Sequence, residues 1–216
     1  MKGTKPTHQG RSRKTQEAII AALDRLLRHQ AFEAITIADL AEEAGVSVGS
    51  VYRRFENKDA LIPVMLDLYQ QRVEARLARA AEIEAAGDAP TTLRGALHRA
   101  MVDAWSSVEE EGHLLRGAHL HSRLQPDLIG EQWTPLIEAS RQSVRDLIRA
   151  FPDEIQRTDE DRMVDAVTYF LNVILIEEGL YSDHGPALLQ TLKGKDFALE
   201  MAEMAYAYLT ATPRIA

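Results

Sequence analysis

The chain has 216 residues, a net charge of −8 and no cysteine. Its length allows one large domain or two small ones, and the lack of cysteine excludes disulfides, thiolate metal sites and cysteine nucleophiles. No stretch reaches the roughly 18 uninterrupted apolar residues that a membrane span needs, and no apolar run follows the basic N-terminus as it would in a secretory signal. We therefore expect a soluble, cytoplasmic protein with no membrane partner.

Charge is distributed unevenly along the chain. Residues 1–60 hold ten Lys or Arg against eight Asp or Glu, whereas the remainder holds fifteen against twenty-five. The first 14 residues contain no acidic residue and five basic ones, namely Lys2, Lys5, Arg11, Arg13 and Lys14. This asymmetry suggests a basic N-terminus that faces nucleic acid, on an acidic body. The alternative is a solvated tail beside an ordinary surface.

The spacing of apolar residues predicts helices in every segment and no sheet. In chain order, these are an amphipathic helix around residues 19–27, two short helices within 36–55, a long helix from about 57 to 87, a helix over 93–108, a looser stretch over 113–124, and helices over 133–150, 161–181 and 197–208. We expect an all-α fold of about nine helices. The change from short to long helices places a domain boundary near residue 57, between domains at 1–57 and 58–216.

Residues 36–55 have the pattern of two short helices joined by a tight turn. Thr36 and Ser47 can each cap a helix, because their hydroxyls can accept a hydrogen bond from an unpaired backbone N–H. Gly45 stands where the first helix must end in a left-handed residue. Two helices that cross steeply over such a turn form a helix-turn-helix, which places its second helix in the major groove of DNA. A tight helical hairpin in a generic bundle is the alternative.

The second short helix carries residue types that suit contact with DNA. Gly49 is a poor helix former, and its use makes sense where another molecule approaches the backbone closely. Tyr52 can bond a phosphate or lie on a base, and Arg53 and Arg54 can pair with phosphates.

This segment resembles the DNA-binding domain of TetR-like transcriptional regulators over residues 14–62. The matching residues are Thr36, Ile37-Ala38, Ala44-Gly45-Val46-Ser47, Gly49, Tyr52, Phe55, Lys58 and Leu61. One departure is Val48, at a position where polar or basic residues are common, and it suggests apolar contact with a base. We expect the DNA-binding residues to be Thr36, Ser47, Val48, Gly49, Ser50, Tyr52, Arg53, Arg54 and Lys58, with Val48 and Ser50 at base edges.

The resemblance implies a homodimeric, usually repressing regulator. Its N-terminal helix-turn-helix domains, of three helices each, would bind a palindromic double-stranded DNA operator. The larger C-terminal helical domain would dimerise and bind a small-molecule effector that lowers DNA affinity. Residues 163–176 are apolar nearly all the way round, so this helix must be covered on both sides. Helices near 161–181 and 195–211 resemble the family's dimer interface, and a buried core helix in a monomer is the alternative.

Aromatic residues with a few polar groups are typical of small-molecule pockets. The middle of the chain offers such a set as candidate effector-binding residues, namely Tyr69, Met101, Trp105, His113, Arg116, His119 and Trp133. Each of them alone also fits a core or surface role. His119 and His121 diverge on a helix, so they do not form a metal pair. We expect no metal, no cofactor and no enzymatic activity.

Two other functions stay open at this point. One is a DNA-binding protein with structural or cell-division duties and no effector. The other is an all-α enzyme or carrier with a vestigial helix-turn-helix, since a helical pocket can hold chemistry that leaves no sequence pattern.

Overall fold

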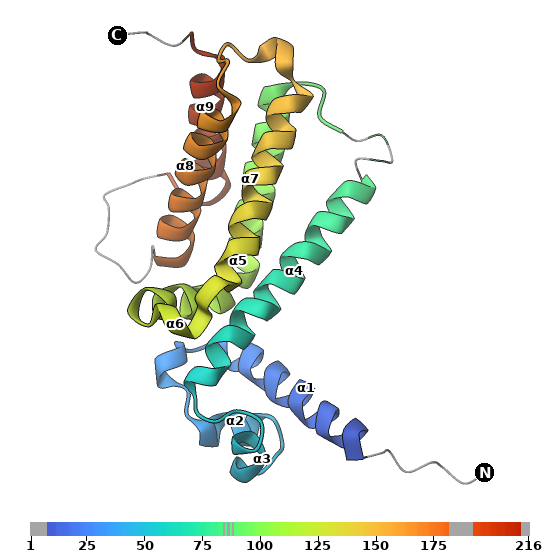
Figure 1. Ribbon diagram of the computed structural model, residues 1–216, viewed down its shortest axis with the longest axis vertical. Helices are drawn as coiled ribbons and strands as arrows, with labels where there is room; N and C mark the ends of the chain where they lie inside the picture. The colour runs from blue at the N-terminus through green and yellow to red at the C-terminus, as the bar shows by residue number, and fades with distance from the viewer. Residues whose placement is uncertain (1–7, 84, 86, 88, 182–191, 213–216) are drawn as a thin grey trace, which may run out of the picture. The chain divides into compact units, whose positions relative to one another are not determined.

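The structure is a computed structural model that describes residues 8–83, 85, 87, 89–181 and 192–212 (Figure 1). Every regular element in these ranges is helical, which confirms the expected all-α fold. Lys2 and Lys5 of the basic N-terminus lie outside the described residues, as does the side chain of Arg11. No helix within the described ranges is both long enough and apolar enough to cross a membrane.

The α-helices are α1 (His8–Leu27), α2 (Ile37–Glu43), α3 (Val48–Tyr52), α4 (Ile62–Ile83), α5 (Leu93–Leu124), α6 (Pro126–Ile129), α7 (Trp133–Ala150), α8 (Glu160–Tyr181) and α9 (Gly194–Thr210). Short 3-10 turns join some of them, namely η1 (Phe32–Ala34), η2 (Asp59–Leu61), η4 (Gly130–Gln132) and η5 (Pro152–Glu154).

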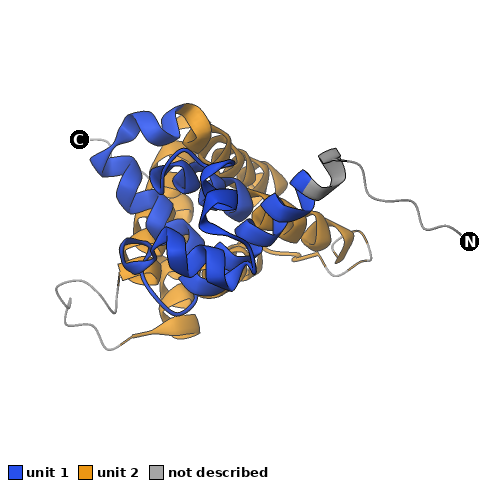
Figure 2. Ribbon diagram, turned by 90° about the horizontal axis from the view of Figure 1, so that it is seen from below, with its two compact units in different colours: residues 1–69, 113–130 blue, residues 70–112, 131–216 orange. Residues whose placement is uncertain are grey.

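The chain divides into two compact units (Figure 2). Unit 1 comprises Met1–Tyr69 and His113–Gly130, and unit 2 comprises Gln70–Gly112 and Glu131–Ala216. Both α4 and α5 therefore contribute residues to both units.

Unit 1 is built around the apolar faces of short helices. In it, α1 packs on α2 and α2 packs on α3. Ile19 and Leu23 on the inner face of α1 are fully buried, as are Leu40 of α2 and Val51 of α3. Burying one such side chain contributes roughly 1.5–3 kcal/mol, so this small core fixes how α3 lies against α1 and α2.

The last turns of α5 also belong to unit 1. Leu114 and Ala118 are fully buried there, and a Cβ added to Gly117 would lie 3.0 Å from the terminal methyl carbon of Met65 and 3.5 Å from Cβ of Phe32. The looser stretch expected over residues 113–124 is instead a continuous part of α5. Glycine is a weak helix former, but here it lets neighbouring side chains approach the helix closely, so that packing compensates for its low propensity.

Unit 2 has its own apolar core. Buried residues of α5, α7, α8 and α9 form it, and α7 packs along α8. A Cβ on Gly179 of α8 would overlap the Cγ1 atom of Val108 on α5 and lie 3.3 Å from its Cβ. Gly179 therefore allows α8 to approach α5 more closely than any larger residue would.

Candidate nucleic-acid interface

Helix α2 begins in a capping box. The Oγ1 atom of Thr36 accepts a hydrogen bond from the backbone N–H of Asp39 at 3.1 Å, and the Thr36 N–H donates to Oδ2 of Asp39 at 2.8 Å. The Thr36 hydroxyl also donates to the same carboxylate at 2.7 Å. These bonds favour the ionised carboxylate, so the side chain of Thr36 and then its backbone lower the pKa of Asp39. The predicted cap at Thr36 is present.

The turn between α2 and α3 has the predicted left-handed glycine. Gly45 has φ of +64°, a conformation that glycine adopts without steric cost. The N–H of Val46 then donates back to the carbonyl of Ala41 at 2.9 Å and closes the turn. Ser47 caps α3 as expected, because its Oγ accepts from the N–H of Ser50 at 3.2 Å.

The outer face of α3 is exposed. Val48 and Tyr52 are 43% and 53% exposed, although both are large apolar or aromatic residues. Gly49 lies beside them on this helix, and a Cβ added to it would meet no heavy atom within 4 Å. The inner face, by contrast, is closed by the buried side chain of Val51.

The two arginines that follow α3 differ in their contacts. Arg53 is exposed, and its Nη2 donates to Oγ of Ser50 at 2.7 Å. Arg54 is half-buried, and it donates to the carbonyl of Ser50 at 2.9 Å and to the carbonyl of Ser12 on α1 at 3.1 and 3.3 Å. Arg54 thus ties α3 to α1. No sequence pattern predicts that Ser12 contacts Arg54, because Ser12 contributes only its backbone carbonyl to this contact.

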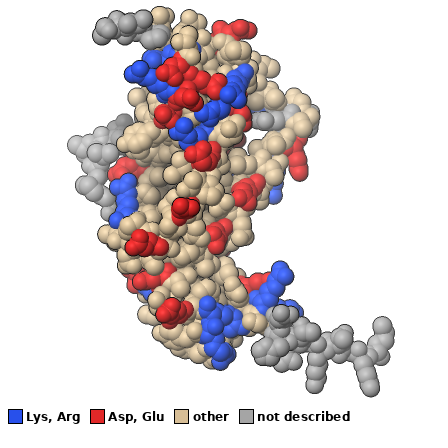
Figure 3. Space-filling view, in the orientation of Figure 1, with Lys and Arg blue, Asp and Glu red and all other residues tan. Residues whose placement is uncertain are grey.

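Lys58 precedes η2 and has contacts inside unit 1. Its Nζ donates to the carbonyl of Glu33 at 2.9 Å and lies 4.7 Å from the ring centre of Phe32. An ammonium has three N–H donors, so this contact leaves donors for a further acceptor. On the face drawn in Figure 3, lysine and arginine side chains lie over the region of α1–α3, with acidic side chains nearby.

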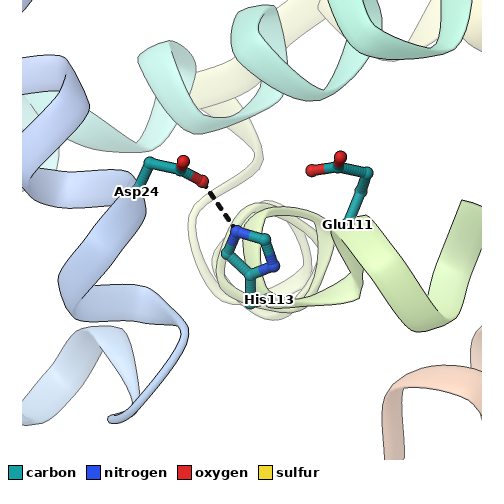
Figure 4. A group of neighbouring side chains, drawn as sticks. All are labelled: Asp24, Glu111 and His113. Atoms are coloured by element: carbon teal, nitrogen blue, oxygen red, sulfur yellow. Dashed lines mark hydrogen bonds and ion pairs between the residues drawn. The ribbon is translucent and has the colours of Figure 1, made fainter.

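The candidate effector residues fall in both units. Tyr69, His113, Arg116 and His119 belong to unit 1. His113 lies on α5, and its Nε2 is 2.7 Å from Oδ1 of Asp24 on α1 (Figure 4). Both side chains of that pair are largely buried, at 12% and 15% exposed.

The other three candidates, Met101, Trp105 and Trp133, belong to unit 2. Met101 and Trp105 are buried in its apolar core. There the Trp105 ring lies edge-on to that of Phe197 at 5.5 Å, and its Nε1–H donates to Glu109 at 2.7 Å. Trp133 is half-buried at the start of α7.

A capped short helix, a left-handed glycine turn and an exposed second helix define a helix-turn-helix protein. Residues 19–65 match the model of a family described as bacterial regulatory proteins, tetR family. Over 73 residues the chain is 37% identical to the HTH-type transcriptional regulator TtgR of Pseudomonas putida, and this match covers 34% of each protein. The chain thus matches about a third of the length of this curated relative.

Solved structures share the fold over most of the chain. A protein from Mesorhizobium loti assigned to the TetR family superposes with a TM-score of 0.65, at 19% identity, over 92% of this chain and 96% of its own. The TetR-family regulator PfmR from Thermus thermophilus gives 0.60, at 18% identity, over 87% and 96%. Residues 19–65 therefore resemble the DNA-binding domain of TetR-family regulators in sequence, and most of the chain shares its fold with solved structures of proteins assigned to that family. The family and the named relatives are regulators rather than enzymes, in line with the expectation of no enzymatic activity.

Proposed function

We propose that this chain is a cytoplasmic transcriptional repressor that binds double-stranded operator DNA through α2 and α3. The observation that carries the proposal is the exposed outer face of α3, where Val48 and Tyr52 lie exposed beside the open space at Gly49. Exposed apolar side chains that lie side by side can mark a surface that binds a partner. A helix presented in this way suits the major groove, where an apolar side chain can contact a thymine methyl group.

Each residue of the site has a proposed role. Val48 contacts base edges, Gly49 allows close approach, and Tyr52, Arg53 and Lys58 bind phosphates. Thr36 and Ser47 hold the starts of α2 and α3, where hydroxyls and backbone N–H groups commonly meet phosphates. Arg54 serves mainly to hold α3 in place, because its guanidinium already bonds the carbonyls of Ser12 and Ser50.

We also propose that the protein acts as a homodimer through α8 and α9. Tyr169 of α8 is 74% exposed, and Val173 one turn further on and Met204 of α9 are also exposed. A second copy would cover these apolar side chains with the same surface, as a two-fold axis requires. Two copies of α3 would then bind half-sites of a palindrome about 34–36 Å apart, or at a multiple of that spacing.

The effector part of the proposal rests on the aromatic and polar residues of the middle of the chain. Met101, Trp105 and Trp133 in unit 2, and Tyr69, His113, Arg116 and His119 in unit 1, are the candidate contacts. An effector would change DNA affinity only through its different affinities for two arrangements of the protein, typically by 1–3 kcal/mol, or about 5–150-fold.

One observation favours a second candidate function, DNA binding without an effector. Met101 and Trp105 are packed among the buried side chains of the unit 2 core, as expected for residues that only stabilise the fold. Intrinsic fluorescence can separate the two functions when small molecules that co-purify with the protein are added back. A change in tryptophan emission together with weaker DNA binding supports an effector, whereas binding to DNA that no such molecule alters supports the alternative.

Selection from a random-sequence pool of DNA duplexes tests DNA binding itself. We expect the purified protein to enrich a palindromic sequence. Recovery of no preferred sequence would reject the proposed function.

A further inference from the structure

The hydroxyl of Ser50 is the centre of a small polar network on α3. Its Oγ lies 2.9 Å from Oγ of Ser47 and accepts a hydrogen bond from Nη2 of Arg53 at 2.7 Å. The carbonyl of the same residue accepts from Nη1 of Arg54 at 2.9 Å. Ser50 thus contacts the N-cap of its own helix and both arginines that follow it.

We propose that Ser50 is a positioning residue, which holds the Arg53 guanidinium in place for DNA rather than contacting a base itself. A serine hydroxyl has one donor and two acceptor positions, and two protein side chains already contact it. Such a hydroxyl has little capacity left to distinguish base edges. This role rests on the proposed function, and it replaces the base-edge contact that the sequence alone predicted for Ser50.

The geometry of Arg53 supports this role. Its bond to Ser50 uses one of the five N–H donors of a guanidinium, and the rest of the planar group suits a phosphate. Arg53 is otherwise a long, exposed side chain, whose rotamers would have to be fixed when DNA binds. A partner that orders the side chain beforehand lowers this cost, which for one side chain corresponds to about a 3- to 10-fold difference in affinity.

The helix that carries this network is itself held in place. Arg54 binds the Ser50 carbonyl and reaches Ser12 on α1, so the backbone at Ser50 is fixed against the core of unit 1. Arg54 therefore holds α3 in place, and the hydroxyl of Ser50 orients Arg53 on the exposed surface of that helix.

The test is a double-mutant cycle of Ser50→Ala and Arg53→Ala, with DNA affinity and base preference measured for each variant. Ser50→Ala should weaken binding to all duplexes by about 3- to 10-fold without changing the preferred bases. In the Arg53→Ala background the same change should have no effect. Ser50→Thr keeps the hydroxyl and should bind within about twofold of the wild type. Ser143→Ala on α7 is the matched control, since that hydroxyl donates to the Ala139 carbonyl of its own helix.

Three results would overturn this role. They are an altered base preference in Ser50→Ala, an equal loss of affinity with and without Arg53, and a Ser50→Thr variant as weak as Ser50→Ala. Failure of the wild type to bind any duplex would instead reject the proposed function together with this role, so the two failures are distinguishable.

Discussion

At the scale of single residues, Gly49 is a position where stability of the fold and the proposed DNA binding favour different residues. Nothing in the described structure lies within 4 Å of a Cβ placed there, so Gly49→Ala introduces no clash. Alanine is the better helix former by about 0.8–1.0 kcal/mol. We predict that Gly49→Ala raises the free energy of unfolding by up to that amount and weakens DNA binding. Urea unfolding and a DNA titration measure the two effects, and unchanged DNA affinity would show that DNA does not approach Gly49 closely.

The Thr36–Asp39 capping box gives a pH-dependent prediction. The pKa of Asp39 is lowered in the folded state, so the ionised carboxylate contributes stability above the ordinary aspartate pKa. That contribution is lost as the pH falls through the lowered value. Asp39→Asn removes this titration. We expect the wild type to have a higher free energy of unfolding than the variant at neutral pH, and urea unfolding should show this difference shrinking as the pH falls. A difference in the free energy of unfolding that is independent of pH would contradict the prediction.

The parts of the site that sequence alone predicted are those with a local physical cause. Thr36, Gly45 and Ser47 were predictable because a cap or a left-handed turn requires particular residue types at particular places. The contacts of Arg54 and Lys58 were not, because both cations donate to backbone carbonyls distant in sequence, at Ser12 and Glu33. A carbonyl is present at every residue and leaves no pattern.

At the scale of elements, the close approach of α8 to α5 depends on Gly179. A Cβ there overlaps Val108, a buried, β-branched residue with few alternative rotamers. We predict that Gly179→Ala lowers the free energy of unfolding by about 1–3 kcal/mol. The double variant Gly179→Ala/Val108→Ala should lose less free energy of unfolding than the two single variants lose in sum, because alanine at position 108 leaves room for the added methyl group.

Gly112→Ala is the matched control on the facing helix. Its Cβ would lie 3.1 Å from Cδ2 of Leu180, at the end of a flexible side chain that can move aside. Gly112→Ala should therefore lower the free energy of unfolding by less than Gly179→Ala does. Additive effects of Gly179→Ala and Val108→Ala would show that the two helices adjust by moving apart.

The helices themselves were largely predictable from apolar spacing, and the continuity of α5 was not. Helical period and caps identify where a helix forms, but Gly112 and Gly117 make residues 113–124 look irregular in sequence. Tertiary packing explains these glycines, since Leu180 lies close to Gly112 and Met65 close to Gly117. Such contacts join residues far apart in the chain, and no local pattern shows them.

At the scale of the whole molecule, both long helices α4 and α5 contribute to both compact units. Either helix is therefore a candidate for the element that connects an effector to the candidate DNA-binding helices. If an effector acts through either helix, reciprocity requires that operator DNA weaken effector binding by the same factor by which the effector weakens DNA binding.

The most direct test of DNA binding through α3 compares the wild type with a Tyr52→Ala/Arg53→Ala variant on the selected duplex over a range of salt concentrations. Both residues are exposed on or directly after α3, so the variant should fold normally, which circular dichroism can check. For the wild type, the logarithm of the binding constant should fall steeply with the logarithm of salt concentration, by about 0.9 per phosphate contacted. The variant should bind more weakly and with a shallower slope. Equal affinity and equal slope for the two proteins would contradict the assignment of DNA binding to this face of α3.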